Sequence, residues 1–448
     1  MTDNPLPAAP THEPKDLRAF LTIWAGQFVS MLGSGLTSFA IGVWIFQKTG
    51  QAMPFALTIL FGNLPNLLLL PVAGSLADRW NRKALMLLAD TGNALVTLAL
   101  FILLLGGELQ TWHIYLLVTV GSVFSAFQEP AYQSSVSLIV PKKELTRANG
   151  IAQTAQAVQT ILTPLLAGGL FVAIGMRGIV LIDFITYFFG VGALLLVHIP
   201  QPQLSAEEKG QKGQLRRDLA FGWTYLRARP GLFALVWYFA MVNFTLNFAA
   251  VLTGPLVLSA HPASAFGFVQ TMTGAGLLVG GLLVSTWGGP KTKRVSVLLA
   301  VISASALGLV IAGLRQPLPF PAAGYFLLMM FIPIGQSISQ AIFQTKVAPE
   351  AQGRVFGMRA LISRSMMPIA FLSSGFLADK LFEPLMQDGG ALANTALGML
   401  LGVGAGRGIG LMFVIAGAVC ILVSALVALN PHIRNVEEEL PDAIGPRP

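Results

Sequence analysis

Long apolar stretches alternate with short polar segments from residue 20 to residue 429. Twelve of them reach the length of about 20 residues that a helix needs to cross a membrane. Several contain proline, for example Pro130, Pro164 and Pro368, which membrane helices tolerate because neighbouring helices satisfy the freed backbone groups. The pattern therefore predicts an all-α membrane protein. The expected spans are 20–46, 53–76, 84–106, 112–139, 148–174, 178–198, 232–259, 264–287, 295–314, 319–346, 353–378 and 407–429.

A polar segment is repeated in the two halves of the chain. Residues 74–80 (GSLADRW) align without a gap with residues 281–287 (GLLVSTW), 207 positions later. A second pair of segments, 128–141 and 336–349, begins with Gln and ends with Pro in both copies, at an offset of 208. Two matches at nearly the same offset predict a duplicated architecture. We expect six spans in each half, arranged as parallel repeats around a central cavity.

The duplication predicts a simple domain organisation. The two six-helix halves are expected at 20–198 and 231–430, and the polar, charged segment 199–230 joins them. Leucine and tryptophan recur near helical spacing among arginines in the second part of this linker, which predicts an amphipathic helix on the membrane surface. We expect a disordered cytoplasmic tail at 1–19 and a second cytoplasmic tail at 431–448.

Composition and charge agree with a membrane protein. The chain is 54% hydrophobic and 11% charged, and its mean hydropathy is +0.70, outside the range of soluble domains. When alternate loops are assigned to opposite sides of the membrane, 23 of the 28 Lys and Arg residues fall on the same side as the two chain termini. This asymmetry predicts that both termini are cytoplasmic. The net charge of +8 is then explained by the orientation of the chain in the membrane. We therefore expect no nucleic-acid partner. The five other basic residues are Lys48, Arg177, Arg315, Lys380 and Arg407.

Motifs for enzymatic chemistry are missing from the sequence. The pattern GxxxxGK[ST] does not occur, and the glycines of 402–410 do not fit a dinucleotide-binding motif. The single cysteine, Cys420, lies in an apolar stretch, and the five histidines are scattered without zinc-ligand spacing. We therefore expect no enzyme activity, no cofactor and no metal.

The repeated segment carries a family resemblance. Residues 74–83, Gly-x-Leu-Ala-Asp-Arg-x-x-Arg-Lys, resemble the signature between helices 2 and 3 of the major facilitator superfamily. Residues 130–149 and 347–355 resemble the branch that contains macrolide-efflux proteins and the enterobactin exporter. The resemblance covers about residues 17–430. It implies the twelve-helix fold of that superfamily, as two six-helix pseudo-repeats in the bacterial cytoplasmic membrane.

The signature predicts a gate. Asp78 is placed to face the positive end of a helix dipole, and Arg79 or Arg82 to pair with acids at nearby helix ends. Asp90, about two turns inside the third span, is expected to join them, and Ser285 takes the place of Asp78 in the second copy. Alternatively, these charges only enforce topology and a tight turn. The predicted gating residues are Gly74, Asp78, Arg79, Arg82, Lys83 and Asp90.

Charged residues inside spans are the candidates for proton coupling or substrate binding. Glu129 lies 12 residues before Pro141, about 18 Å along a helix and therefore close to the membrane midplane. A charge there must face a cavity, pair or carry a proton; the alternative is an acid that only holds helices together. Arg364 is a candidate partner for an acid or an anionic substrate group. Asp183 is expected to pair with Arg177.

Amide side chains recur near helical spacing in several spans. Such stripes line a substrate path or form a hydrogen-bonded seam between helices, and the superfamily's cavity side favours the path. The expected cavity-lining residues are Gln27, Asn63, Gln128, Gln133, Asn243, Asn247, Gln336 and Gln340.

We expect a secondary transporter that exports an amphipathic small molecule, such as a drug-like compound, macrolide or siderophore, by alternating access and proton antiport. Its expected partners are the substrate, protons and membrane lipid, and we expect a monomer. Two alternatives remain open. One is an importer or facilitator of a small metabolite, in which Glu129 would only bind substrate. The other is a transport-inactive membrane scaffold or sensor that kept the fold.

Overall fold

The computed structural model describes residues 17–141, 144–199, 214–434, 436–440 and 442. Within these ranges all regular elements are helices. The long helices before the linker are α1 (Leu17–Thr49), α2 (Ala52–Arg79), α3 (Arg82–Gly106), α4 (Thr111–Ile139) and α5 (Leu145–Leu196). Those after it are α7 (Pro230–Leu258), α8 (Ala263–Trp287), α9 (Arg294–Leu314), α10 (Pro319–Lys346), α11 (Pro349–Leu377) and α14 (Arg407–Leu429). The short elements are α6 (Gln214–Arg227), a π-helical turn η2 (Ala378–Phe382), α12 (Glu383–Met386), α13 (Ala396–Leu401), α15 (Pro431–Arg434) and α16 (Val436–Glu439).

The long helices account for the predicted spans. Ten helices in the described part of the chain are long and apolar enough to cross a membrane, and α4, with 29 residues, is also long enough. Helix α5 has 52 residues and is interrupted at Gly175, where φ is 66° and ψ is −176°. Glycine adopts this backbone conformation without the steric cost of a Cβ, so α5 supplies two spans. The predicted all-α membrane fold is confirmed.

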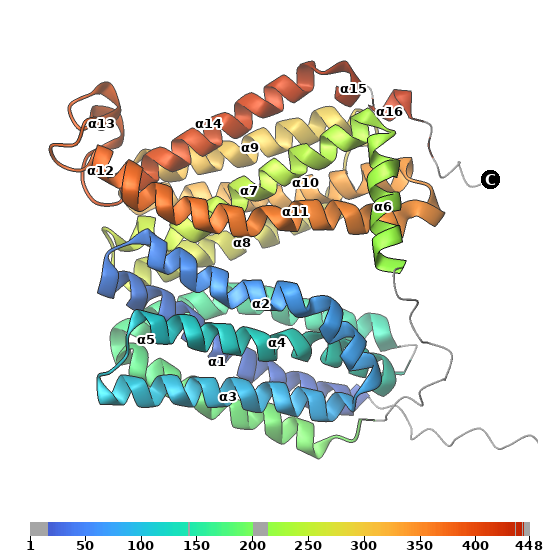
Figure 1. Cartoon of the computed structure of the whole chain (residues 1–448), viewed down its shortest axis with the longest axis vertical. Helices are drawn as coiled ribbons and strands as arrows, with labels where there is room; N and C mark the ends of the chain where they lie inside the picture. The colour runs from blue at the N-terminus through green and yellow to red at the C-terminus, as the bar shows by residue number, and fades with distance from the viewer. Residues whose placement is uncertain (1–16, 142–143, 200–213, 435, 441, 443–448) are drawn as a thin grey trace, which may run out of the picture.

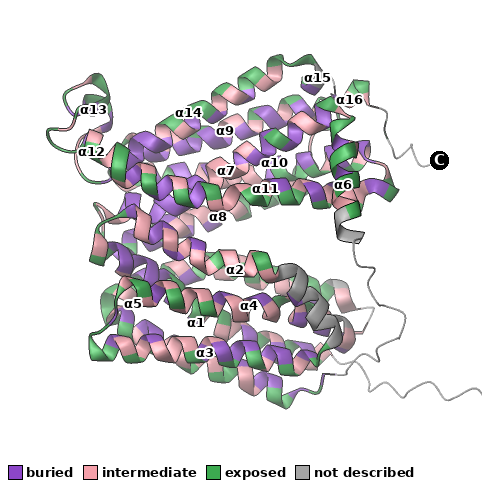
Figure 2. Cartoon of the chain, in the orientation of Figure 1, coloured by how far each residue is buried: buried purple, intermediate pink, exposed green. Residues whose placement is uncertain are grey.

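The outward faces of the helices are apolar. Leu95 and Ile102 on α3 and Leu422 and Leu426 on α14 are each more than half exposed, and exposed and half-buried residues recur along both helices (Figure 2). Large apolar surface of this extent is unfavourable in water and marks contact with lipid. Lipid also explains why the backbone is helical, since each span satisfies its own polar groups.

The two halves of the molecule pack together at one end only (Figure 1). We call this the closed end; there α1 ends and α2 and α8 begin. Its hydrophobic core contains residues of both halves, and Phe266 of α8 stacks on Phe39 of α1 at 4.9 Å between ring centroids. We call the opposite end the linker end; there α1 begins and α14 ends. Two separate hydrophobic clusters lie at this end: one contains only residues before 200, and the other contains only residues after 218. The halves therefore separate toward the linker end.

Close backbone contact between α5 and α8 forms part of the closed end. A Cβ placed on Gly267 would lie 2.3 Å from the carbonyl oxygen of Pro164 and 3.1 Å from Cα of Gly168. The Thr271 hydroxyl donates to the carbonyl oxygen of Ile161 at 3.4 Å. Glycine at position 267 is what allows the two helices to approach this closely, as small residues do in membrane bundles.

A carboxylate of the second half caps a helix of the first half. Asp379, in η2, accepts hydrogen bonds from the backbone N–H groups of Ala52 (2.8 Å) and Met53 (2.7 Å) in the first turn of α2. The first N–H groups of a helix lack partners within the helix, and a negative charge there is favoured by the helix dipole. This cap therefore links the two halves directly at the closed end.

We expect Asp379→Ala to loosen the closed end. Loss of a capping side chain costs about 1 kcal/mol, which is about a fivefold change in an equilibrium constant. Ala56 on α2 is 1% exposed and contacts the position of Gly375 on α11. In a Cys420→Ser background, a cysteine introduced as Ala56→Cys should react with a maleimide about fivefold faster once the cap is removed.

Asp388→Ala is the matched control, because Asp388 is an exposed acid on the same connection after α12. It should leave the labelling rate unchanged. Equal rates for wild type and Asp379→Ala would show that the cap does not hold the closed end.

Candidate functional site

A buried carboxylate joins three helices of the first half. Asp90 on α3 is 6% exposed. The Gln27 amide on α1 donates to its Oδ2 at 2.9 Å. The Gln128 amide on α4 donates both to Asp90 Oδ1 and to Gln27 Oε1, the latter at 2.9 Å. We refer to Gln27, Asp90 and Gln128 as the amide–carboxylate triangle.

The triangle explains how Asp90 is accommodated inside a span. A carboxylate is costly within the membrane unless protein groups compensate it, and hydrogen bonds to a charged group are stronger than neutral ones. Sequence reasoning placed Asp90 with the gate and placed Gln27 and Gln128 on a cavity wall; the structure brings all three together. Arg147, a basic residue near the linker end, forms its ion pair with Glu144 at 3.7 Å.

Two predicted gating bases hold carbonyl groups at the linker end. Arg82 is buried, and its Nη1 donates to the carbonyl oxygen of Ser134 on α4 at 2.9 Å. Lys83 donates to the carbonyl oxygens of Leu195 (3.2 Å) and Val197 (2.8 Å), where α5 ends. Basic side chains satisfy the last carbonyls of a helix and complement its dipole there. These contacts tie α3 to α4 and α5, and a role in gating stays a prediction.

Three further gating candidates belong to the end of α2. The surroundings of Gly74, Asp78 and Arg79 lie outside the described part of the structure. Ser285, which occupies the place of Asp78 in the second copy, donates to the carbonyl oxygen of Leu282 at 2.8 Å in its own helix. The second copy of the segment therefore uses this position for a local helix contact.

Glu129 lies on the wall of a cavity of about 590 Å³ formed by α1, α4 and the first part of α5, which we call the open cavity. The Gln133 amide donates to Glu129 Oε1 at 3.0 Å. Aromatic faces complete the wall, with Trp24 and Phe28 stacked at 5.6 Å between centroids and Tyr132 nearby in the lining. An acid, amides and aromatic rings on one wall can bind an amphipathic molecule that carries a positive charge.

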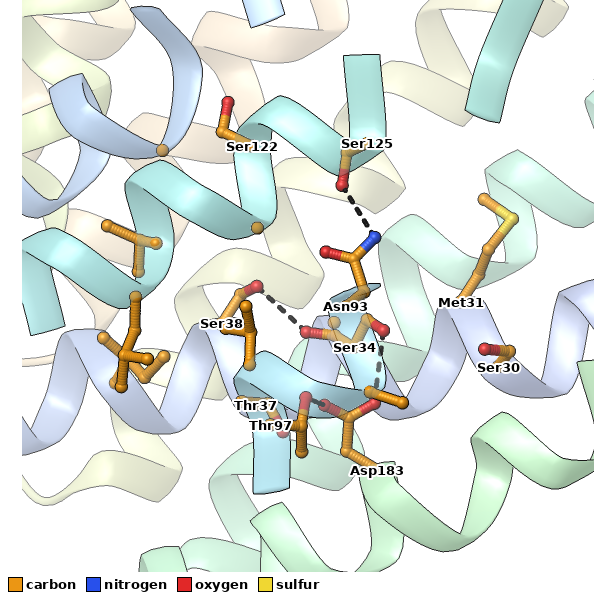
Figure 3. Close-up of a pocket in the computed structure, with 18 of the residues that line it drawn as sticks. Ser30, Met31, Ser34, Thr37, Ser38, Asn93, Thr97, Ser122, Ser125 and Asp183 are labelled. Atoms are coloured by element: carbon orange, nitrogen blue, oxygen red, sulfur yellow. Dashed lines mark hydrogen bonds between the residues drawn. The ribbon is translucent and has the colours of Figure 1, made fainter. Parts of the chain in front are cut away.

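A second cavity of about 580 Å³, the inner cavity, lies within the first half and is lined from α1 to α5. Its wall includes Asp183, which sequence reasoning paired with Arg177 and did not place on a cavity wall. Asp183 accepts hydrogen bonds from the hydroxyls of Ser34 (3.1 Å) and Thr97 (3.2 Å) (Figure 3). The signal in the sequence was an acid inside the predicted span 178–198, about two turns from one end. The expected pair with Arg177 is not formed, because Arg177 donates to the carbonyl oxygen of Leu104 at 2.9 Å.

The two cavities share part of their lining. Gln27 and Gln128 face both, whereas Asp90 lines only the inner cavity and Glu129 only the open one. Asn63, a predicted lining residue on α2, is exposed to the inner cavity, and its amide donates to a backbone carbonyl of its own helix at 2.8 Å. The triangle therefore forms the partition between the cavities.

The predicted lining residues of α7 make mostly local contacts. The Asn243 amide donates to the carbonyl oxygen of Phe239 at 2.9 Å and to the hydroxyl of Ser363 on α11 at 3.5 Å. The Asn247 amide donates to the carbonyl oxygen of Asn243 at 2.8 Å. One of these bonds joins α7 to α11, so Asn243 contributes to a seam between helices of the second half.

Other polar candidates of the second half are exposed. Gln336 and Gln340 lie on α10, and Arg364 lies on α11. The described residues include no hydrogen-bond or ion-pair partner for the Arg364 guanidinium. Arg359, one turn closer to the linker end, contacts the hydroxyl of Ser339 at 2.7 Å and the ring of Phe343. No acid occurs in the sequence between residues 219 and 349, and the next acids, Glu350, Asp379 and Glu383, lie at the start of α11 and just after its end.

Comparisons with known proteins agree with this architecture. Residues 23–372 match the family model described as Major Facilitator Superfamily. The chain is 30% identical over 372 residues to macrolide efflux protein A of Streptococcus pyogenes, covering 81% of this chain and 90% of that protein. It is 24% identical over 351 residues to the enterobactin exporter EntS of Shigella flexneri, covering 76% and 80%. The crystal structure of the nucleoside transporter NupG shares the fold, with a TM-score of 0.63 at 13% identity over 91% of this chain and 98% of that one.

We expect Gln128→Leu to destabilise the protein more than Gln133→Leu does. Both changes replace an amide on α4, but Gln128 bonds to buried Asp90 and to Gln27, whereas Gln133 bonds to Glu129 on an open wall. Leaving a buried polar group short of partners costs about 1–3 kcal/mol. Thermal unfolding in detergent should give a lower apparent melting temperature for Gln128→Leu. Equal melting temperatures for the two variants would contradict a structural role of the triangle.

Proposed function

Because the chain belongs to the Major Facilitator Superfamily, we propose that it is a secondary transporter that exports amphipathic small molecules from bacteria in exchange for protons. The observation that carries this proposal is the open cavity, in which Glu129 lies beside amides and stacked aromatic rings. The similarity to proteins named for macrolide efflux and enterobactin export supports the export direction.

The proposed orientation places the linker end in the cytoplasm. The excess of Lys and Arg on that side supports it through the positive-inside rule. In this orientation the separated halves face the cytoplasm, the side from which an exported compound enters. The closed end, with the Asp379 cap and the α5–α8 contact, faces outward. The protein then acts in the bacterial cytoplasmic membrane with both termini inside.

The chemistry of the open cavity favours an amphipathic cation as substrate. Macrolides such as erythromycin combine a large apolar ring with an amine that is protonated at neutral pH. The stacked rings of Trp24 and Phe28 offer apolar and cation–π contact, and the Glu129 carboxylate offers a counter-charge. The same combination suits other drug-like compounds and the polar groups of a siderophore.

In the proposed cycle, Glu129 binds either the substrate's positive charge or a proton. The ionised carboxylate binds the cation while the linker end is open. After the molecule opens outward, a proton from outside binds the carboxylate, removes its charge and releases the substrate. The proton leaves to the cytoplasm when the linker end reopens. One carboxylate that holds two ligands in turn couples their opposite movements.

The second half supplies the opposite wall in this proposal. Gln336, Gln340 and Arg364 are exposed polar groups on α10 and α11, and Asn243 and Asn247 lie on α7. The gate at the linker end is assigned to the residues around the segment 74–83 together with Asp90. We propose that one chain forms the complete pathway as a monomer surrounded by lipid.

Glu129→Gln should abolish pH-driven efflux. The amide keeps the shape of the side chain but has neither a negative charge nor an exchangeable acid proton. In inverted membrane vesicles, accumulation of erythromycin driven by an acidic lumen should fall at least tenfold. Immunoblotting should show the variant in the membrane at the wild-type level.

Glu108→Gln is the matched control, since Glu108 is an exposed acid of the first half that lines neither cavity. It should transport at the wild-type rate. Undiminished efflux by Glu129→Gln would exclude Glu129 as the coupling residue. Erythromycin counterflow without any response to a pH gradient in the wild type would favour a facilitator.

A further inference from the structure

The inner cavity is polar and large enough to contain water. Its volume of about 580 Å³ is far above the roughly 15 Å³ that a single water molecule needs. Hydroxyl and amide groups project from its wall, and several point toward one another in the close-up view (Figure 3). The polar lining includes Ser30, Ser34, Ser38, Asn93, Thr97, Ser122 and Ser125.

Thr37 adds a further hydroxyl beside Asp183. It lines the cavity and is 6% exposed, and it lies next to the carboxylate (Figure 3). Hydroxyl groups from α1 and α3 therefore surround the Asp183 carboxylate, and water in a polar cavity can join such a network.

The carboxylic acids of this cavity face no basic side chain in its lining. Asp90 from α3 and Asp183 from α5 are the acids of the wall, and Tyr187 from α5, whose hydroxyl is bonded to Thr91 at 3.0 Å, is its other titratable group. Helices α1, α2 and α4 contribute no Asp, Glu, Lys, Arg or His to the lining. The carboxylates are compensated by hydroxyls and amides, so neither is held as a permanent ion pair.

The two acids lie at different depths. Gln27 contacts Asp90 and Ser34 contacts Asp183, and these two residues are seven positions apart on α1, or about 10 Å. Thr58, also on the wall, is six residues from the start of α2 at the closed end, or about 9 Å. The cavity therefore extends from near the closed end to the partition formed by the triangle.

From this arrangement we propose that the inner cavity is a proton pathway, in which Asp183 and Asp90 are two proton-binding stations joined by water. This proposal rests on the proposed function, and it adds a route by which protons reach Glu129. The substrate occupies the open cavity, and the proton passes behind it through the first half. A side route of this kind keeps Glu129 accessible to protons while the substrate fills the open cavity.

Each step transfers one proton and no electrons. When the closed end opens, a hydronium ion from outside gives its proton to the Asp183 carboxylate and becomes water. Asp183 passes the proton through cavity water to the Asp90 carboxylate, and each O–H bond formed is matched by one broken. A shift of Gln27 or Gln128, which line both cavities, connects Asp90 with water beside Glu129.

The first test separates proton coupling from substrate exchange. In inverted vesicles, Asp183→Asn should reduce erythromycin accumulation driven by an acidic lumen at least tenfold. Erythromycin counterflow at uniform pH should stay within about twofold of wild type, because Asp183 does not line the open cavity. Glu108→Gln should leave both activities unchanged. Retention of accumulation by Asp183→Asn would overturn the proposal, as would accumulation driven by a Na⁺ gradient at uniform pH.

A second variant covers the case in which Asp183→Asn fails to fold. Asn93 lines the inner cavity and its amide donates to the Ser125 hydroxyl at 3.3 Å. Asn93→Leu keeps both acids but places an apolar side chain in the water path. It should show the same separation, with accumulation lost and counterflow kept. Full accumulation in this variant would overturn a water-borne path.

Infrared spectroscopy tests proton binding without any transported compound. In purified, reconstituted protein, a pH titration should reveal the carbonyl stretch of protonated carboxylic acids. Asp183→Asn and Asp90→Asn should each remove part of that band, and Glu108→Gln should not. A band unchanged in both variants would overturn the proposal. If the wild type does not transport erythromycin, the proposed function fails, and the infrared result still decides whether Asp183 binds a proton.

Discussion

Polar groups surrounded by hydrocarbon must find their partners within the protein, and this constraint governs the structure at every level. It makes the spans helical. It surrounds Asp90 with two amides and Asp183 with two hydroxyls, and it places the Asp379 carboxylate on free N–H groups of α2. These hydrogen-bonded groups line the cavities and the contact between the halves. They are therefore in positions where they can bind a proton or a charged substrate, or hold two helices together.

The two halves share a scaffold but differ in their acids. The repeated segments at offsets of 207 and 208 supply the symmetry that alternating access requires. The first half has acids deep within its helices, whereas the second half has none between residues 219 and 349 and carries Asp379 and Glu383 beyond the end of α11. Of these two, Asp379 forms a contact between the halves. We infer that the first half carries proton chemistry, while the second half supplies a wall and the contacts that open and close.

Much of the fold followed from the sequence, because span length and hydropathy are local properties. The family resemblance and the all-α membrane fold were confirmed. The proximity of Glu129 and Gln133 follows from their spacing of four on one helix. The triangle could not be foreseen, because Gln27, Asp90 and Gln128 come from three helices whose rotations depend on packing. The pairing of Asp183 with Arg177 was wrong for the same reason: the turn at Gly175 directs Arg177 to the end of α3.

The central claim is that an inward proton gradient drives export through this chain. The most direct measurement is erythromycin accumulation by wild-type protein in inverted vesicles, with the lumen made acidic, neutral or alkaline at zero membrane potential. The account predicts accumulation only with an acidic lumen, and rapid loss when nigericin collapses the gradient. Accumulation of equal size at all three lumen pH values would contradict proton-coupled export.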